Sequence, residues 1–103
     1  MTFSISTTDA GITRLSIEGE LDALTVSELR AGVERLQARR LSRLEIDLSL
    51  LRMIDSAGVG LLVGLKKRVQ AQGGEVIVTG LRDQPLAIFR LLRLDGSGGQ
   101  PTS

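Results

Sequence analysis

Hydrophobic and polar residues alternate along several short stretches of the chain, a pattern that predicts β-strands. We expect a first strand at Phe3–Ser6 and a second at Ile12–Leu21, joined into a hairpin by the turn residues 9–11. A central strand is expected over about Arg43–Leu48, and another over the β-branched run Glu75–Gly80. These runs supply the strands of one sheet.

Three other stretches repeat apolar residues at helical spacing. They predict one helix over about Thr25–Ala38, a second over about Ala57–Gln72 that Gly73 and Gly74 terminate, and a third that begins near Pro85. The resulting order is β-β-α-β-α-β-α, an antiparallel pair followed by strands that right-handed helical crossovers connect. The sequence therefore predicts a small α/β fold, in which helices pack on a mixed sheet of four to five strands.

The length of 103 residues fits one domain, which we place at residues 1–94. Only 2% of the residues are aromatic, so the core is expected to be built from Leu, Ile and Val. Residues 95–103, DGSGGQPTS, contain almost no apolar side chain, and we expect them to form a disordered C-terminal tail.

Composition excludes several classes of function. The chain has no Cys and no His, which rules out disulfides, thiolate chemistry and histidine bases and disfavours zinc sites, so no metal or other cofactor is expected. A net charge of +1 and the scarcity of aromatic residues give no basis for binding nucleic acid. No signal peptide and no membrane-spanning run is present, so we expect a cytoplasmic protein that does not insert into a membrane.

Asp55 and Ser56 occupy the junction between the central strand and the second helix. We expect Ser56 to be the N-cap, its hydroxyl accepting an N–H of the first helical turn. A helix N-terminus also offers free N–H groups and a positive dipole end to an anion, so a phosphate on Ser56 would be partly stabilised there.

Glycines recur in the second helix at Gly58, Gly60 and Gly64, although each destabilises a helix by about 1 kcal/mol relative to Ala. Two explanations stay open at this point. The glycines allow close packing of the helix against the sheet or another helix, or they leave a bare helix face beside Ser56 on which the backbone of a partner lies.

The sequence gives little support for catalysis. Paired carboxylates for acid–base chemistry would have to come from Asp22, Asp47 or Asp55, and no nucleophile has a base beside it. Ser56 has no histidine to activate it, and the nearest lysines lie more than two helical turns away. We therefore expect no enzyme, with a small hydrolase that uses loop carboxylates as a remaining alternative.

Four motifs, in this strand and helix order, resemble the STAS family, specifically the bacterial anti-sigma factor antagonists (anti-anti-sigma factors). The main motif is DSAGVGLL at residues 55–62, followed by the glycine pair at residues 73–74. The others are GELD at residues 19–22 and IDLS at residues 46–49. The resemblance extends from about Ile12 to Leu94.

The resemblance implies a partner switch in transcription regulation. Members bind an anti-sigma factor that is also an ATP-dependent serine kinase, and they thereby free a sigma factor. The kinase phosphorylates the serine that corresponds to Ser56, the phosphoprotein dissociates, and a separate phosphatase resets the cycle. ATP belongs to the partner in this scheme, so this chain would be a substrate and a binder. The positions expected to line the phosphorylation site or contact the partner are Asp22, Asp55, Ala57, Gly58 and Gly60.

The family also contains members that are not partner switches, and this alternative stays open. One branch acts as a small cytoplasmic accessory subunit of lipid-transport ABC systems, and another belongs to stress-signalling complexes. In either role, binding would not depend on phosphorylation.

Overall fold

The computed structural model describes residues 1–94, so the tail expected at residues 95–103 lies outside the described residues. Its strands are β1 (Thr2–Thr7), β2 (Ile12–Leu21), β3 (Arg43–Ile54) and β4 (Glu75–Thr79). Its helices are α1 (Val26–Gln37), α2 (Ser56–Ala71) and α3 (Asp83–Leu91). The order of elements is the one that the hydrophobic pattern predicts.

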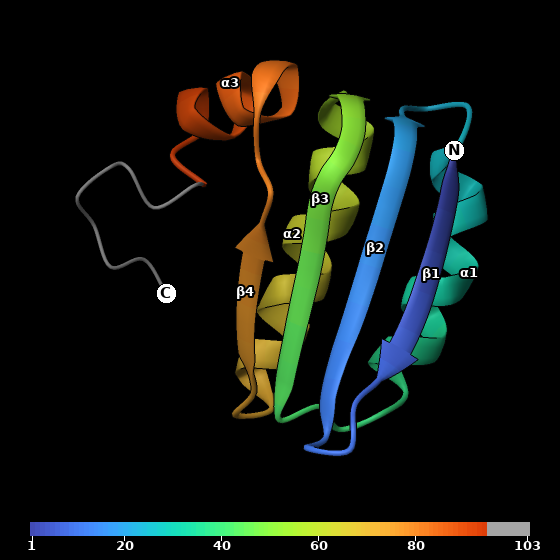
Figure 1. Ribbon diagram of the computed structural model, residues 1–103, viewed down its shortest axis with the longest axis vertical. Coiled ribbons are helices and arrows are strands. Elements are labelled where there is room, and N and C mark those ends of the chain that lie inside the picture. Colours follow the sequence, from blue (N-terminus) through green and yellow to red (C-terminus); the bar gives the residue numbers. More distant parts are fainter. Residues whose placement is uncertain (95–103) are drawn as a thin grey trace.

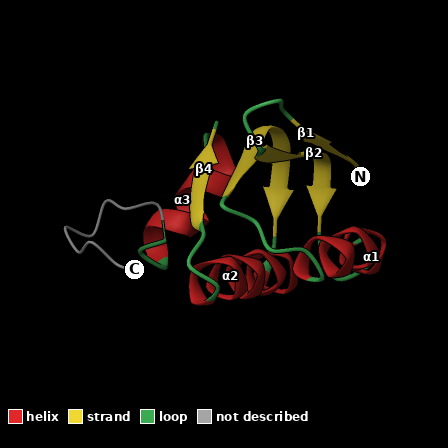
Figure 2. Ribbon diagram, turned by 90° about the horizontal axis from the view of Figure 1, so that it is seen from below, coloured by secondary structure: helices red, strands yellow, loops and turns green. Residues whose placement is uncertain are grey.

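The four strands form one mixed sheet in the order β1-β2-β3-β4. β1 pairs antiparallel with β2, and β2, β3 and β4 run parallel to one another. Helices α1 and α2 lie side by side against one face of the sheet, whereas α3 lies beyond the end of β4 (Figures 1 and 2). The expected α/β fold, with helices packed on a mixed sheet, is confirmed.

The core between sheet and helices is aliphatic, as the composition predicts. Its fully buried side chains include Leu15, Ile17, Leu44, Ile46 and Leu48 from the sheet and Leu29, Val33, Leu36 and Leu65 from the helices. Phe89 of α3 is the one aromatic residue among the buried core residues of the described chain.

Strand β3 is longer than the sequence predicts, because it continues from Leu48 to Ile54. Its pairing with β2 shifts register twice, between Ser16 and Glu18 and between Gly19 and Glu20. Each shift inserts an extra residue in β3, as in a β-bulge, and so breaks the alternation of inward and outward side chains. The period-two pattern therefore ends before the strand does.

The third helix begins at Asp83, two residues before the expected start at Pro85. The residue between them, Gln84, hydrogen-bonds through its side-chain amide to the main chain of Ile54 in β3. This contact joins α3 to the end of the central strand, immediately before Asp55.

Candidate functional site

The candidate site lies where β2 and β3 end, at the top of the sheet in Figure 1. The loop from β2 into α1 and the start of α2 meet there. Asp55 N–H donates to the Leu21 carbonyl at 3.1 Å, which joins the two strand ends directly before their helices. The parallel pairing of β2 and β3 thus brings Asp22 and Asp55, which are far apart in sequence, to the same end of the sheet, directly after the last residues of the two strands.

Asp55, rather than Ser56, is the N-cap of α2, so the prediction of a serine cap is wrong. Asp55 Oδ1 accepts the N–H groups of Ala57 at 3.0 Å and Gly58 at 3.1 Å. The second carboxylate oxygen accepts the N–H of Ala23 at 3.1 Å, in the loop that precedes α1. Asp55 therefore caps one helix and fastens the neighbouring loop.

The sequence predicts that the N–H groups at the start of α2 are free to bind an anion. In the structure, two of them already donate to the Asp55 carboxylate. A phosphate on Ser56 would still lie near the positive end of the helix dipole. It would, however, lie beside a carboxylate and could not take the place of Asp55 without breaking these bonds.

Asp22 organises the loop in front of α1. Its Oδ1 accepts the N–H groups of Leu24 and Thr25, each at 3.0 Å, and lies 3.1 Å from the Thr25 hydroxyl. Asp22 N–H in turn donates to the hydroxyl oxygen of Thr25 at 3.0 Å. The carboxylate thus stabilises a compact turn next to Ala23, the residue that Asp55 holds.

Ser56 is the first residue of α2, and its side chain is exposed. Within residues 1–94 its hydroxyl has no hydrogen-bond partner. With the cap supplied by Asp55, this hydroxyl has no structural task in the described chain and is accessible to another molecule.

The three glycines of α2 have two different environments. Gly58 is buried, and a Cβ there would come within 2.8 Å of both Leu21 and Ile54, so close packing explains this glycine. A Cβ at Gly60 or Gly64 would meet nothing within 4 Å, and both residues are exposed. Close packing therefore accounts for Gly58, whereas for the exposed Gly60 and Gly64 contact with a partner stays a prediction.

Ser56, Gly60 and Gly64 follow one another at intervals of four residues, so they lie along one side of α2. All three are exposed. This stripe, which we call the Ser56 face, is a strip of nearly bare backbone that begins at the serine. Ala57 lies beside its start and is half-buried.

Leu24 is a surface residue that the sequence reasoning missed. Its side chain is 87% exposed, on the loop that Asp22 and Asp55 hold in place. The hydrophobic pattern could have indicated this exposure, because Leu24 does not fit the helical spacing of the buried residues Val26, Leu29 and Val33.

The described residues contain no group of three or more carboxylates close enough to hold a metal ion. Asp55 accepts main-chain N–H groups through both carboxylate oxygens, and Asp22 accepts them through Oδ1. No helix among residues 1–94 is long and apolar enough to cross a membrane.

Comparison with known protein families identifies the family to which this fold and these motifs belong. The family model described as "Mlab, STAS domain" matches residues 5–99. The chain belongs to the STAS domain family. The resemblance drawn from the motifs at residues 19–22, 46–49 and 55–62 is thereby confirmed.

Two relatives of this STAS domain carry names that state a role. The anti-sigma-B factor antagonist of Listeria monocytogenes is 32% identical over 80 residues, which cover 78% of this chain and 68% of the relative. The anti-sigma F factor antagonist of Paenibacillus polymyxa is 31% identical over 87 residues, or 84% of this chain and 72% of the relative. Among solved structures, the phosphorylated form of the Bacillus cell fate determinant SpoIIAA has the same fold. That match has a TM-score of 0.74 at 22% identity and covers 92% of this chain and 86% of SpoIIAA.

Proposed function

We propose that this STAS domain is an anti-sigma factor antagonist. It binds an anti-sigma factor and so releases a sigma factor, and phosphorylation of Ser56 switches the binding off. Two relatives named as antagonists of anti-sigma factors, each about a third identical to the chain, support the first part. The observation that carries the switch is an exposed serine at the start of α2 whose hydroxyl has no partner within residues 1–94.

The surface around Ser56 suits contact with a protein. The Ser56 face offers helix backbone that a partner can approach closely, because Gly60 and Gly64 have no side chain and no neighbour. Leu24 adds an exposed apolar side chain on the adjoining loop, of the kind that protein interfaces bury. We assign Leu24, Ser56 and Gly60 to the centre of the partner contact, with Ala57 at its margin.

Charge explains how a phosphate would end the contact. A phosphoserine carries a charge of about −1.5 to −2 at neutral pH. At Ser56 it would adjoin the Asp55 carboxylate, whose N–H partners are already in place. The free protein tolerates this charge, because the site faces water. In the complex the phosphate would lose its hydration, and a penalty of about 3 kcal/mol lowers affinity roughly a hundredfold.

Asp22 and Asp55 act in this proposal by holding the surface in shape. Both support the loop on which Leu24 lies, and Asp55 also fixes the first turn of α2. Gly58 contributes in the same way, by allowing the helix to approach Leu21 and Ile54. The partner kinase would supply the ATP, and a phosphatase would restore Ser56.

Paired baits test the proposal. Ser56→Ala and Ser56→Glu are immobilised and exposed to cytoplasmic extract of the native host, and the retained proteins are identified by mass spectrometry. We expect an anti-sigma factor with an ATP-binding serine kinase domain to be retained by Ser56→Ala and lost from Ser56→Glu. The purified partner should also transfer phosphate to Ser56 of the unaltered chain.

Ser42 provides a matched control, since it is an exposed serine directly before β3, at the end of the sheet opposite Ser56. Ser42→Glu should leave retention unchanged. Equal retention of the partner by Ser56→Ala and Ser56→Glu would refute the switch. Equal retention of a transport ATPase by both would instead establish an accessory subunit that does not depend on phosphorylation.

A further inference from the structure

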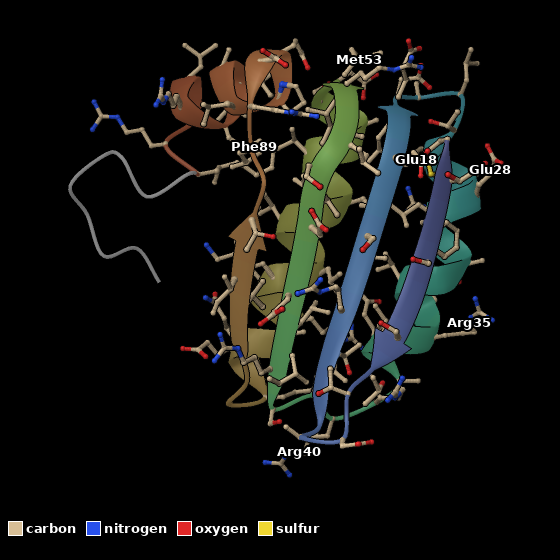
Figure 3. All side chains as sticks on the ribbon, in the orientation of Figure 1. Glu18, Glu28, Arg35, Arg40, Met53 and Phe89 are labelled. Atoms are coloured by element: carbon tan, nitrogen blue, oxygen red, sulfur yellow. The ribbon has the colours of Figure 1, made fainter. Side chains whose placement is uncertain are left out.

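An apolar cleft of about 320 Å³ lies between α2, β4 and α3, on the side of the domain that carries the helices. Its floor is formed by buried Ile46, Leu62 and Phe89. Half-buried Val63 and Val78 form part of its walls. In Figure 3, Phe89 lies under α3, toward the strands. The volume is at the lower end of the range of small-molecule sites, about 300–1,000 Å³.

Cations border this cleft on two sides. Lys66 and Lys67 of α2 and Arg93, just after α3, belong to its lining, and the described lining contains no acidic residue. None of the three forms an ion pair with another residue in the range 1–94. The other polar group of α2 at the cleft is the amide of Gln70, which is uncharged.

We propose that this cleft binds a single-chain amphipathic anion of the fatty-acid type. The aliphatic and aromatic floor matches a hydrocarbon chain, and the unpaired cations at the rim match one carboxylate head group. The volume favours one chain over a two-chain lipid. The absence of carboxylates in the described lining disfavours a cationic ligand. The site is separate from Ser56, because Lys66 lies ten residues further along α2, a rise of about 15 Å.

Titration with sodium dodecanoate, below its micelle concentration and at pH 7.5, tests the proposal. Amide chemical shifts of the ¹⁵N-labelled full chain should change at residues 62–70, Val78 and Phe89, with little change at Ser16 on the far side of the sheet. Affinity measured by calorimetry should rise from octanoate to dodecanoate, by up to about fourfold for each methylene buried. Dodecyltrimethylammonium, with the same chain and the opposite charge, should bind at least tenfold more weakly.

Two variants locate the head group and the chain. Lys66→Gln with Lys67→Gln should lower the affinity for dodecanoate about tenfold and make it less sensitive to salt. The matched control is Arg68→Gln, which removes the next cation of α2, outside the cleft lining, and should have no effect. Val63→Phe narrows the cleft and should weaken dodecanoate more than octanoate.

Other results would overturn the proposal. One is that dodecyltrimethylammonium binds as tightly as dodecanoate. Another is that Arg68→Gln lowers the affinity for dodecanoate as much as the two lysine substitutions do. A third is that the changes in amide chemical shift spread over the whole chain. If dodecanoate binds only after residues 95–103 are deleted, the cleft is occupied by the chain itself. Binding only to vesicles that contain phosphatidylglycerol would indicate a membrane surface, and self-association that Val63→Phe abolishes would indicate a second copy.

Discussion

The side-chain amide of Gln84 forms both hydrogen bonds that a neighbouring strand would give to Ile54. Gln84 Nε2 donates to the Ile54 carbonyl and Gln84 Oε1 accepts the Ile54 N–H, each at 2.9 Å. Strand β4 cannot supply these bonds, because its pairing with β3 ends at the Asp47–Thr79 pair. Gln84 therefore completes the edge of β3 directly before Asp55 and Ser56.

Replacing Gln84 should destabilise the domain at this edge. Gln84→Ala leaves the N–H and carbonyl of Ile54 without their partner, and we expect a loss of about 1–3 kcal/mol in the free energy of unfolding. Urea denaturation followed by circular dichroism measures the change. Gln37→Ala, at the end of α1, removes an amide with no hydrogen bond to a described residue and should change stability by less than about 0.5 kcal/mol. Equal stability of the two variants would show that water replaces Gln84 without loss.

Asp55 should contribute to stability through two separate connections. Asp55→Ala removes the cap of α2 and the bond to Ala23 N–H, and we expect a loss of about 1–2 kcal/mol. Asp55→Asn retains one acceptor oxygen and should lie between Asp55→Ala and the unaltered chain in thermal unfolding. Asp9→Ala, in the exposed β1–β2 turn, is the control and should unfold like the unaltered chain. If Asp55→Ala behaves like Asp9→Ala, the cap has no energetic role.

Much of this fold could be predicted from the sequence, because each element up to Leu48 has a regular period and a clear turn. The end of β3 could not, because two bulges break the alternation of side chains between Leu48 and Ile54. The sequence predicts Ser56 as the cap of α2 where the structure has Asp55, because both residue types cap helices and the backbone conformation decides between two adjacent candidates. Asp55 is extended, with φ −111° and ψ −174°, whereas Ser56 is already helical.

The contacts that shape the site were harder to predict, because they join residues far apart in sequence. The bonds from Asp55 to Ala23 and from Gln84 to Ile54 require the parallel pairing of strands and the position of α3. The apolar cleft likewise depends on how α3 approaches α2 and β4. Sequence motifs located the serine and the two acidic residues, but only the three-dimensional structure separates their roles.

Protonation of the Asp47 carboxylate should lower the stability of the domain in acid. Its Oδ1 accepts the N–H of Ser49 at 3.0 Å, where β3 leaves its regular register. The hydrogen bonds from Ser49 hold the pKa of Asp47 below its ordinary value of 3.8, and Arg14 adds a smaller attraction in the same direction. The folded chain thus binds the proton less readily than the unfolded chain, so this stabilisation is complete above pH 3.8 and is lost as pH falls through the folded pKa.

The variant Asp47→Asn tests this dependence. Between pH 5 and pH 2.5, its free energy of unfolding should fall less than that of the unaltered chain, and the two curves should converge at the acid end. Asp9→Asn, in an exposed turn, should follow the unaltered chain over the whole range. Parallel curves for Asp47→Asn and the unaltered chain would mean that this carboxylate is not responsible.

The glycines of α2 give a pair of substitutions with opposite expected effects. Gly58→Ala forces a methyl group to within 2.8 Å of Leu21 and Ile54, and we expect a loss of about 1–2 kcal/mol in the free energy of unfolding. Gly60→Ala adds a methyl group in open space and should stabilise the helix by about 0.5–1 kcal/mol. If the Ser56 face is the partner surface, Gly60→Ala should nevertheless weaken partner binding at least tenfold, because the methyl group holds the partner away from the backbone. A Gly60→Ala domain that is more stable and binds its partner as tightly as the unaltered chain would place the interface elsewhere.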